Sequence, residues 1–332
     1  MIEPLNQKIE EARKLISFSE KIILATHEHP DGDGFAAMLA FYFWLKSVGK
    51  EPVLFIKERL PQYLKFLPGI EYISREIPEG KYELLIGFDY GDFERLGMGG
   101  WLGLQEQIKV IAFDHHAEGR QGGDIHVIDT RAASTTIVVH KFLNLLRAEI
   151  TPRIATCVLA GIVADTGGFI HSNADIEAFD VAADMMRRGA DFMKVVRGIL
   201  NKKNPLFLRL WGEALLRIKL DSESGLALSW IGAEDFKKHG ADREAVVDFS
   251  GVLSTVTNSR SAVFLSQEAN EPNMVKGSLR SEEYKGVDVS RLASLFGGGG
   301  HKLAAGFKIE GRLQDVIQKL ILEAKTLNRF KF

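Results

Sequence analysis

The chain has 332 residues, of which 45% are hydrophobic and 26% charged, a composition and length that suit a globular protein of two domains. Its formal net charge of −2 argues against a bulk electrostatic attraction to duplex nucleic acid, but it is compatible with a locally basic pocket that binds a short anion. The single cysteine, Cys157, excludes an intrachain disulfide and a thiolate zinc cluster. Without a signal pattern or an apolar run of about 20 residues, we expect a cytoplasmic protein with no membrane partner.

The first half of the chain alternates helical patterns with short apolar runs. Residues 5–19 carry apolar groups at helical spacing, and residues 21–26 and 53–56 are predicted strands separated by an apolar helix over 35–45. A strand, a helix and a strand in this order form a right-handed unit with parallel strands. Further strands are predicted at 83–88, 108–113 and 125–128, and further helices at 133–147, 151–164 and 175–188. The predicted fold class is α/β, with a doubly wound, mainly parallel sheet.

Histidine and aspartate residues follow these strands. His27 follows the first strand, Asp31 and Asp33 lie in the next turn, Asp89 follows the strand 83–88, and Asp114-His115-His116 follow the strand 108–113. Carboxyl ends of parallel strands meet at one edge of a sheet, which is where ligands bind. Adjacent histidines are costly to bury unless they bind something. Imidazole with carboxylates suits Mn²⁺ or Mg²⁺ better than a structural zinc.

Each group alone has a simpler interpretation. Asp31 and Asp33 could cap the following helix. Asp165 could be a helix-end residue before two glycines, and His171, nearby in sequence, is assigned to a surface loop. Several groups converging on one edge favour a metal site over these separate explanations.

The second half changes character after Asn201–Pro205, the predicted domain boundary. Strands at 226–231, 262–266 and 274–279 precede a glycine-rich loop, 297–301, and an amphipathic helix over 313–327. The predicted domains are 1–190 and 213–332, joined by a linker 191–212 and separated by a cleft. Backbone N–H groups of such a loop can approach a phosphate, although four glycines can also form a merely flexible loop.

These residues resemble a known family. The blocks His27-x-x-x-Asp31-x-Asp33, Asp89, Asp114-His115-His116 and Asp165 resemble the four motifs of the DHH phosphoesterases. The stretch 297–306 resembles the hallmark of the DHHA1 accessory domain, and 277–281 is similar to its substrate-binding strand. The resemblance covers nearly the whole chain. In length and layout the chain is most similar to the nano-RNase type, oligoribonucleases that also hydrolyse 3′-phosphoadenosine 5′-phosphate (pAp).

The resemblance implies a role for each residue. The first metal ion is assigned to His27, Asp31 and Asp89, and the second to Asp33, Asp89, His115 and Asp165. Mn²⁺ is expected, with Mg²⁺ as the alternative. His116 would act on the substrate as hydrogen-bond donor or general acid, and Asp114 would orient the histidines. The expected substrate-binding residues are Arg280, Gly298, Gly299, Gly300 and His301. Ala36-Ala37 and Ile137 depart from the family pattern, which usually has a Gly-Ser pair and often a Glu there.

The expected activity is hydrolysis of short oligonucleotides, of pAp, or of both, by a water activated between two metal ions. The expected partners are short single-stranded RNA or DNA oligonucleotides or nucleotides, and a homodimer is compatible with the sequence. One alternative is a soluble phosphodiesterase of c-di-AMP, c-di-GMP or linear dinucleotides. An alternative of another class is a catalytically silent nucleotide-binding regulator.

Overall fold

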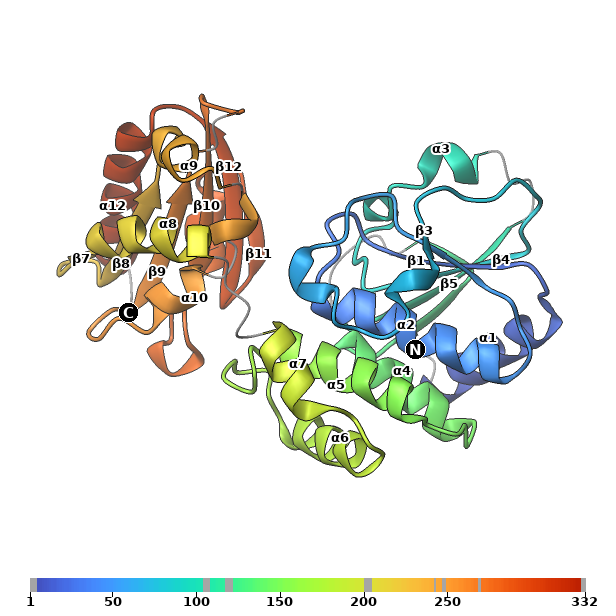
Figure 1. Cartoon of the computed structure of the whole chain (residues 1–332). Helices are drawn as coiled ribbons and strands as arrows, with labels where there is room; N and C mark the ends of the chain where they lie inside the picture. The colour runs from blue at the N-terminus through green and yellow to red at the C-terminus, as the bar shows by residue number, and fades with distance from the viewer. Residues whose placement is uncertain are drawn as a thin grey trace. The chain divides into compact units, whose positions relative to one another are not determined.

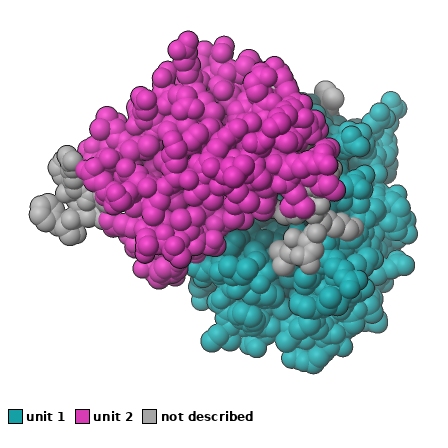
Figure 2. Space-filling model, turned by 60° about the vertical axis from the view of Figure 1, so that its left-hand side comes forward, with its two compact units in different colours: residues 1–202 teal, residues 203–332 magenta. Residues whose placement is uncertain are grey.

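The computed structural model describes residues 5–103, 108–116, 122–199, 205–241, 243–246, 249–267 and 270–329. The chain forms two compact units, residues 1–202 and 203–332 (Figures 1 and 2). Helix α7 (Phe192–Ile199) of the first unit and helix α8 (Pro205–Leu216) of the second occupy much of the interval expected to be a linker. Most of the boundary expected at 201–205 lies outside the described residues. Among the described residues, no helix is both long and apolar enough to span a membrane.

The first unit contains a six-stranded sheet in the order β3-β2-β1-β4-β5-β6, and every pairing in it is parallel. This confirms the predicted parallel α/β fold. Strand β1 pairs with β2 on one side and with β4 on the other, so the topological switch point lies between β1 and β4. The strands are β1 (Ile22–Thr26), β2 (Val53–Phe55), β3 (Ile73–Ser74), β4 (Leu84–Phe88), β5 (Lys109–Asp114) and β6 (Ile125–Ile128).

The two faces of this sheet are covered differently (Figure 1). Alternate residues of β1 show it: Ile22 and Leu24 join the core formed with the large helices, whereas Ile23 and Ala25 join a smaller core with residues 90–102. Among the described residues, the connection from β4 to β5 contributes only short helical turns, Phe93–Leu96 and Gly99–Leu102, to that face. The helices of this unit besides α7 are α1 (Leu5–Phe18), α2 (Gly32–Ser47), α3 (Gly99–Leu102), α4 (Thr135–Leu145), α5 (Pro152–Asp165) and α6 (Ile176–Arg187).

The second unit has a mixed sheet in the order β11-β12-β10-β9-β8-β7, in which only β8 and β9 run parallel. Helices α11 and α12 pack on one face, and α8, α9 and α10 pack on the other. The strands are β7 (Lys219–Asp221), β8 (Leu226–Ile231), β9 (Ser261–Ser266), β10 (Met274–Arg280), β11 (Gly299–His301) and β12 (Ala304–Glu310). The remaining helices are α9 (Ala233–His239), α10 (Phe249–Ser254), α11 (Val289–Ser294) and α12 (Leu313–Arg329).

The glycine-rich stretch is not the irregular loop that the sequence suggested. Gly299 to His301 form β11, which pairs antiparallel with β12 in a hairpin. Gly298 lies so close to β12 that a Cβ atom there would be 2.1 Å from the carbonyl oxygen of Gly306. A side chain at this position is excluded by the neighbouring backbone, so this glycine has a packing reason independent of any ligand.

Candidate metal centre

The turn after β1 brings His27 and Asp31 together at the start of α2. The Nδ1 atom of His27 lies 2.7 Å from the carbonyl oxygen of Glu28, which can only accept, so Nδ1 carries the proton. The Nε2 atom then faces Asp31, 3.6 Å from Oδ2. Oδ1 of Asp31 accepts from the N–H groups of Asp33 and Gly34, both at 3.1 Å, and so caps α2. Capping and metal binding are therefore compatible, since they use different oxygens of one carboxylate.

Asp33 is buried in the first turn of α2, and its carboxylate reaches the N-terminus of α4. It accepts from the backbone N–H groups of Thr135 at 2.5 Å and Thr136 at 3.0 Å. These groups have no partner within their own helix, and the positive end of the helix dipole favours a carboxylate. A Cβ atom at Gly161 of α5 would lie 2.5 Å from Asp33 Oδ1. Glycine at position 161 thus allows α5 to approach this carboxylate.

Asp89 lies at the switch point, directly after β4, and is 3% exposed. Its φ of +56° is in the left-handed region, which is unfavourable for a residue with a side chain and is found at functional sites. Its two carboxylate oxygens face different groups: Oδ2 lies 4.0 Å from Nε2 of His27, and Oδ1 lies 3.7 Å from Nε2 of His115. Such an orientation suits a carboxylate shared between two cations.

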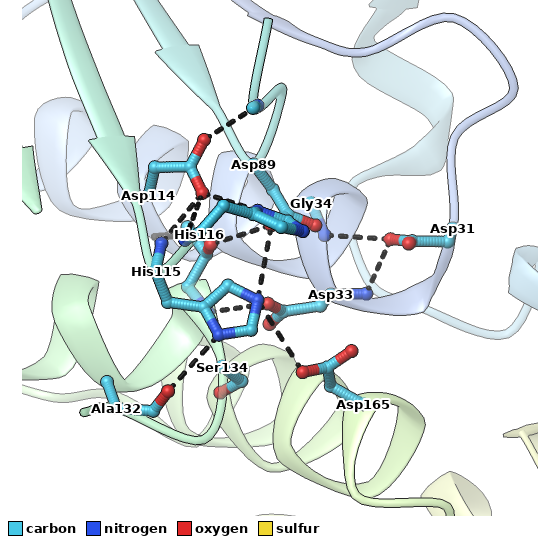
Figure 3. Close-up of polar contacts among 12 residues, drawn as sticks. Asp31, Asp33, Gly34, Asp89, Asp114, His115, His116, Ala132, Ser134 and Asp165 are labelled. Atoms are coloured by element: carbon cyan, nitrogen blue, oxygen red, sulfur yellow. Dashed lines mark hydrogen bonds and ion pairs between the residues drawn. The ribbon is translucent and has the colours of Figure 1, made fainter. Parts of the chain in front are cut away.

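Asp114 is fully buried at the end of β5 and is surrounded by N–H donors (Figure 3). Oδ1 accepts from the backbone N–H of His115 at 2.7 Å, from that of His116 at 2.9 Å and from Nδ1 of His116 at 2.7 Å. Oδ2 accepts from the N–H of Gly91 at 2.8 Å. Burial would raise the pKa of Asp114, but the bonds from His116 lower it overall. Both oxygens are used to hold the turn, which fits the predicted orienting role.

His115 and Asp165 face each other across the end of α5. The Nδ1 atom of His115 lies 3.1 Å from the carbonyl oxygen of Ala132, and its Nε2 lies 3.6 Å from Oδ2 of Asp165. The side-chain amide of Asn173 donates to the same Oδ2 at 3.4 Å. His171, assigned to a surface loop, is exposed as expected, but its Nδ1 lies 3.1 Å from the carbonyl oxygen of Asp165. Asn173 was not predicted from the sequence.

The donor atoms fit divalent cations of the size of Mn²⁺ or Mg²⁺. Ligands around an ion with bonds of about 2.1 Å lie roughly 3–4 Å apart, and the separations of 3.6–4.0 Å given above fall in this range. Within the described residues, three groups have ligand atoms within 4.8 Å of one another: His27 with Asp31 and Asp89, Asp33 with His115 and Asp165, and Asp89 with His115 and His116. The first group is the predicted first ligand set. The second contains three of the four residues predicted for the second ion, and Asp89 Oδ1 is the fourth.

His116 approaches Asp89 with its Nδ1 atom. That atom lies 3.5 Å from Oδ1 of Asp89 but 2.7 Å from Oδ1 of Asp114. The shorter contact is a hydrogen bond, so Nδ1 is used by Asp114. The geometry therefore assigns Nδ1 of His116 to Asp114 and not to a metal ion.

The like charges of this cluster repel one another. Burial raises the pKa of Asp89 well above its usual value, and the charges of Asp31, Asp33, Asp114 and Asp165 raise it further. Burial also raises the pKa of Asp33. A bound cation relieves both effects because it favours the ionised carboxylates.

The two departures from the family pattern leave this cluster intact. Ala36 and Ala37 are fully buried in α2, and Ile137 is fully buried in the apolar core of the first unit. These apolar side chains need no hydrogen-bond partner in this apolar setting.

In the second unit, Arg280 and His301 share one face of the sheet. Both are in register with Ala304, Arg280 from β10 and His301 from β11. Residues in register point to the same face, and two strand spacings of about 4.8 Å place their backbones roughly 10 Å apart. His301, Gly299 and Gly300 are exposed, and Arg280 is partly exposed. The two predicted phosphate-binding side chains therefore lie near each other.

Comparison with known proteins gives the family. Residues 21–162 match the DHH family N-terminal domain, and residues 226–326 match the DHHA1 domain. The chain belongs to the DHH family, and its second unit carries the DHHA1 domain.

Two NrnA proteins are similar to this chain over most of its length. The bifunctional oligoribonuclease and PAP phosphatase NrnA of Thermus thermophilus is 33% identical over 91% of this chain and 88% of that protein. The protein of the same name from Bacillus subtilis is 26% identical over 95% of this chain and 96% of that protein. In fold, the chain is similar to an exopolyphosphatase-related protein from Bacteroides fragilis, with a TM-score of 0.86 and 23% identity over 97% of this chain and 96% of that one.

We predict that divalent cations stabilise the protein. At a hundredfold excess over Kd, each ion adds about 2.7 kcal/mol, which is roughly 5–10 °C in Tm for a domain of this size. Differential scanning calorimetry with Mn²⁺ and with EDTA measures the shift. Asp89→Asn removes one of the repelling charges, so it should leave Tm in EDTA unchanged or higher and should abolish most of the shift caused by Mn²⁺.

The matched control is Glu94→Gln, which removes an exposed carboxylate outside the cluster. This variant should retain the full shift. An Asp89→Asn protein that responds to Mn²⁺ as the wild type does would contradict the assignment of Asp89.

Proposed function

We propose that this protein is a divalent-metal-dependent phosphoesterase that hydrolyses short single-stranded oligonucleotides and pAp. The observation that carries the proposal is the orientation of Asp89, whose two oxygens face the separate groups around His27 and His115. Hydrolysis of phosphate esters commonly uses two cations that share one carboxylate and one water. The similarity to the two NrnA proteins supports the choice of substrates.

In this proposal His27, Asp31 and Asp89 hold one ion, and Asp33, Asp89, His115 and Asp165 hold the other. Two bound cations supply a water of lowered pKa and neutralise charge on the phosphoryl oxygens. Mn²⁺ is proposed for both positions because imidazole and carboxylate occur together in each set, and Mg²⁺ is the alternative. His27 and His115 each donate a hydrogen bond from Nδ1 to a backbone carbonyl oxygen. This bond fixes the tautomer in which Nε2 is available as a metal ligand.

His116 is the proposed proton donor. Asp114 accepts from Nδ1 of His116 and so orients the imidazole ring. Nε2–H of His116 would then donate to a phosphoryl oxygen or to the leaving oxygen. Asp114 acts through His116 and His115 and is therefore a positioning residue.

Arg280, Gly298, Gly299, Gly300 and His301 are proposed to bind the far end of the substrate. The guanidinium group can bind a phosphate with two parallel hydrogen bonds, and His301 lies on the same face of the sheet. Besides the phosphate that is hydrolysed, pAp carries a second phosphate and a short oligonucleotide carries a terminal nucleotide. Either group could occupy this part of the second unit. Binding of long duplex DNA is not expected. A cytoplasmic location and a homodimer stay predictions from the sequence.

A panel of substrates with Mn²⁺ tests the function. We expect turnover of pAp and of di- to pentaribonucleotides, and slower turnover of c-di-AMP and c-di-GMP. Faster hydrolysis of a cyclic dinucleotide than of all linear substrates would favour the alternative phosphodiesterase. No turnover of any of them by protein with both ions bound would favour a regulator and would refute the proposal.

Asp89→Ala should reduce kcat more than Asp114→Ala does. Asp89 contributes to both proposed ions, whereas Asp114 only orients the histidines. We expect a loss of about 10–100-fold for Asp114→Ala, the usual range for groups that orient metal ligands, and a much larger loss for Asp89→Ala. Circular dichroism controls for folding, because Asp114→Ala leaves several buried N–H groups without an acceptor. Equal losses in two folded variants would contradict the sharing of Asp89.

Arg280→Ala should raise KM for pAp and dinucleotides at least tenfold, since a hydrogen bond to a charged group contributes about 1.5–3 kcal/mol. Manganese content should not change. The control is Arg291→Ala, which removes an exposed arginine of α11. Unchanged KM in Arg280→Ala would exclude Arg280 as a substrate ligand.

A further inference from the structure

The segment 132–136, which precedes α4 and forms its first turn, contacts three of the four residues assigned to the second ion directly and Asp165 through Asn173. The carbonyl oxygen of Ala132 accepts from His115, and that of Ala133 accepts at 3.1 Å from Asn173, which also bonds Asp165. The N–H groups of Thr135 and Thr136 bond Asp33, and the Thr135 hydroxyl bonds Asp89. By contrast, His27 and Asp31 bond Glu28 and the first turn of α2.

Thr135 makes two of these contacts and is fully buried. Its hydroxyl donates to Oδ1 of Asp89 at 2.9 Å, the oxygen that faces His115 and not His27. The terminal torsion of an aspartate is broad, so the position of each oxygen depends on what it bonds. A hydroxyl has a single proton to donate, and here that proton selects Oδ1. The bond therefore holds one oxygen of Asp89 towards each ion position.

Loss of the hydrogen bond from Thr135 would allow the Asp89 carboxylate to rotate. Nδ1 of His116 also lies 3.5 Å from Oδ1, but Asp114 already accepts from that atom. Without the Thr135 hydroxyl, Oδ1 of Asp89 is therefore held less firmly towards His115. Turning the carboxylate moves both oxygens, but the first ion position keeps His27 and Asp31, which Glu28 and the first turn of α2 hold, whereas the second position loses the contact that fixes its shared ligand.

We propose that Thr135 is a positioning residue that orients Asp89 and thereby sets the affinity of the second ion separately from that of the first. The inference rests on the proposed two-ion function. Groups that orient metal ligands typically change metal affinity about 10–100-fold when they are lost. Loss of the Thr135 hydroxyl should change the affinity for the second ion by a factor of this size and should change the affinity for the first ion much less.

Thr135→Val tests the inference, because it replaces the hydroxyl by a methyl group of similar volume and keeps the N–H group that bonds Asp33. In calorimetric titration with Mn²⁺, the wild type should bind two ions. The variant should bind one ion with an affinity within a few-fold of wild type and the other about 10–100-fold more weakly. The electron paramagnetic resonance signal of the coupled ion pair should change to that of a single Mn²⁺ at intermediate concentrations. Thr135→Ser, which restores a hydroxyl, should return both affinities to within a few-fold of wild type.

Thr136→Val is the matched control. Thr136 is the next residue, is also buried and also bonds Asp33 through its N–H group, but its hydroxyl lies 2.8 Å from Oγ of Ser134. This variant should bind both ions as the wild type does. Asn173→Ala should weaken the same ion as Thr135→Val, because Asp165 is assigned to that ion alone.

Turnover of pAp provides a second measurement. At intermediate Mn²⁺, Thr135→Val should lower kcat and leave KM within a few-fold, and added Mn²⁺ should restore kcat. Equal weakening of both ions, unchanged binding, or failure of Thr135→Ser to restore affinity would overturn the inference. A wild-type protein that binds two ions and turns over none of the substrates would overturn the proposed function alone. Binding of a single ion by the wild type would overturn both.

Discussion

Negative charge confined to a small buried volume is the constraint on which the first unit depends. Asp33, Asp89 and Asp114 are almost completely buried at one edge of the sheet, where an unpaired ion is very costly. Backbone N–H groups compensate Asp33 and Asp114, but the Asp89 carboxylate accepts one hydroxyl proton, from Thr135. The pKa of Asp89 is accordingly raised well above its usual value, by burial and then by its neighbours. The need for a cation is thus greatest at the residue that faces both ion positions.

The arrangement of helices follows from the same constraint. Helices α2 and α4 direct their N-termini towards the cluster, and the dipole of each favours the carboxylate that it receives, Asp31 and Asp33 respectively. Helix α5 brings Asp165 at its C-terminus, the end that disfavours a carboxylate. His115 and Asn173 contact this carboxylate with their side-chain nitrogens. At Asp31 and Asp33, by contrast, backbone N–H groups at a helix N-terminus make the corresponding contacts.

The predicted strands and the residues that follow them were found from the sequence because two local signals coincide. An apolar run marks each strand, and a histidine or aspartate next to it marks the edge, as for His27 and Asp89. Thr135 and Asn173 carry no such signal, since their roles depend on contacts with residues distant in the sequence, such as Asp89. The hairpin β11-β12 was missed for a related reason: glycines have low strand propensity, and Gly299 is in a strand only because it pairs with β12.

The absent side chain at Gly161 also bears on the spacing between Asp33 and Asp165. Gly161 precedes Asp165 by four residues, so both lie on the same side of α5, and the backbone at 161 rests against Asp33. Only a residue without a side chain lets α5 lie this close to the Asp33 carboxylate and the Thr136 side chain. A larger residue at 161 would push α5, and Asp165 with it, away from Asp33, although position 161 is one turn away from the Asp165 carboxylate.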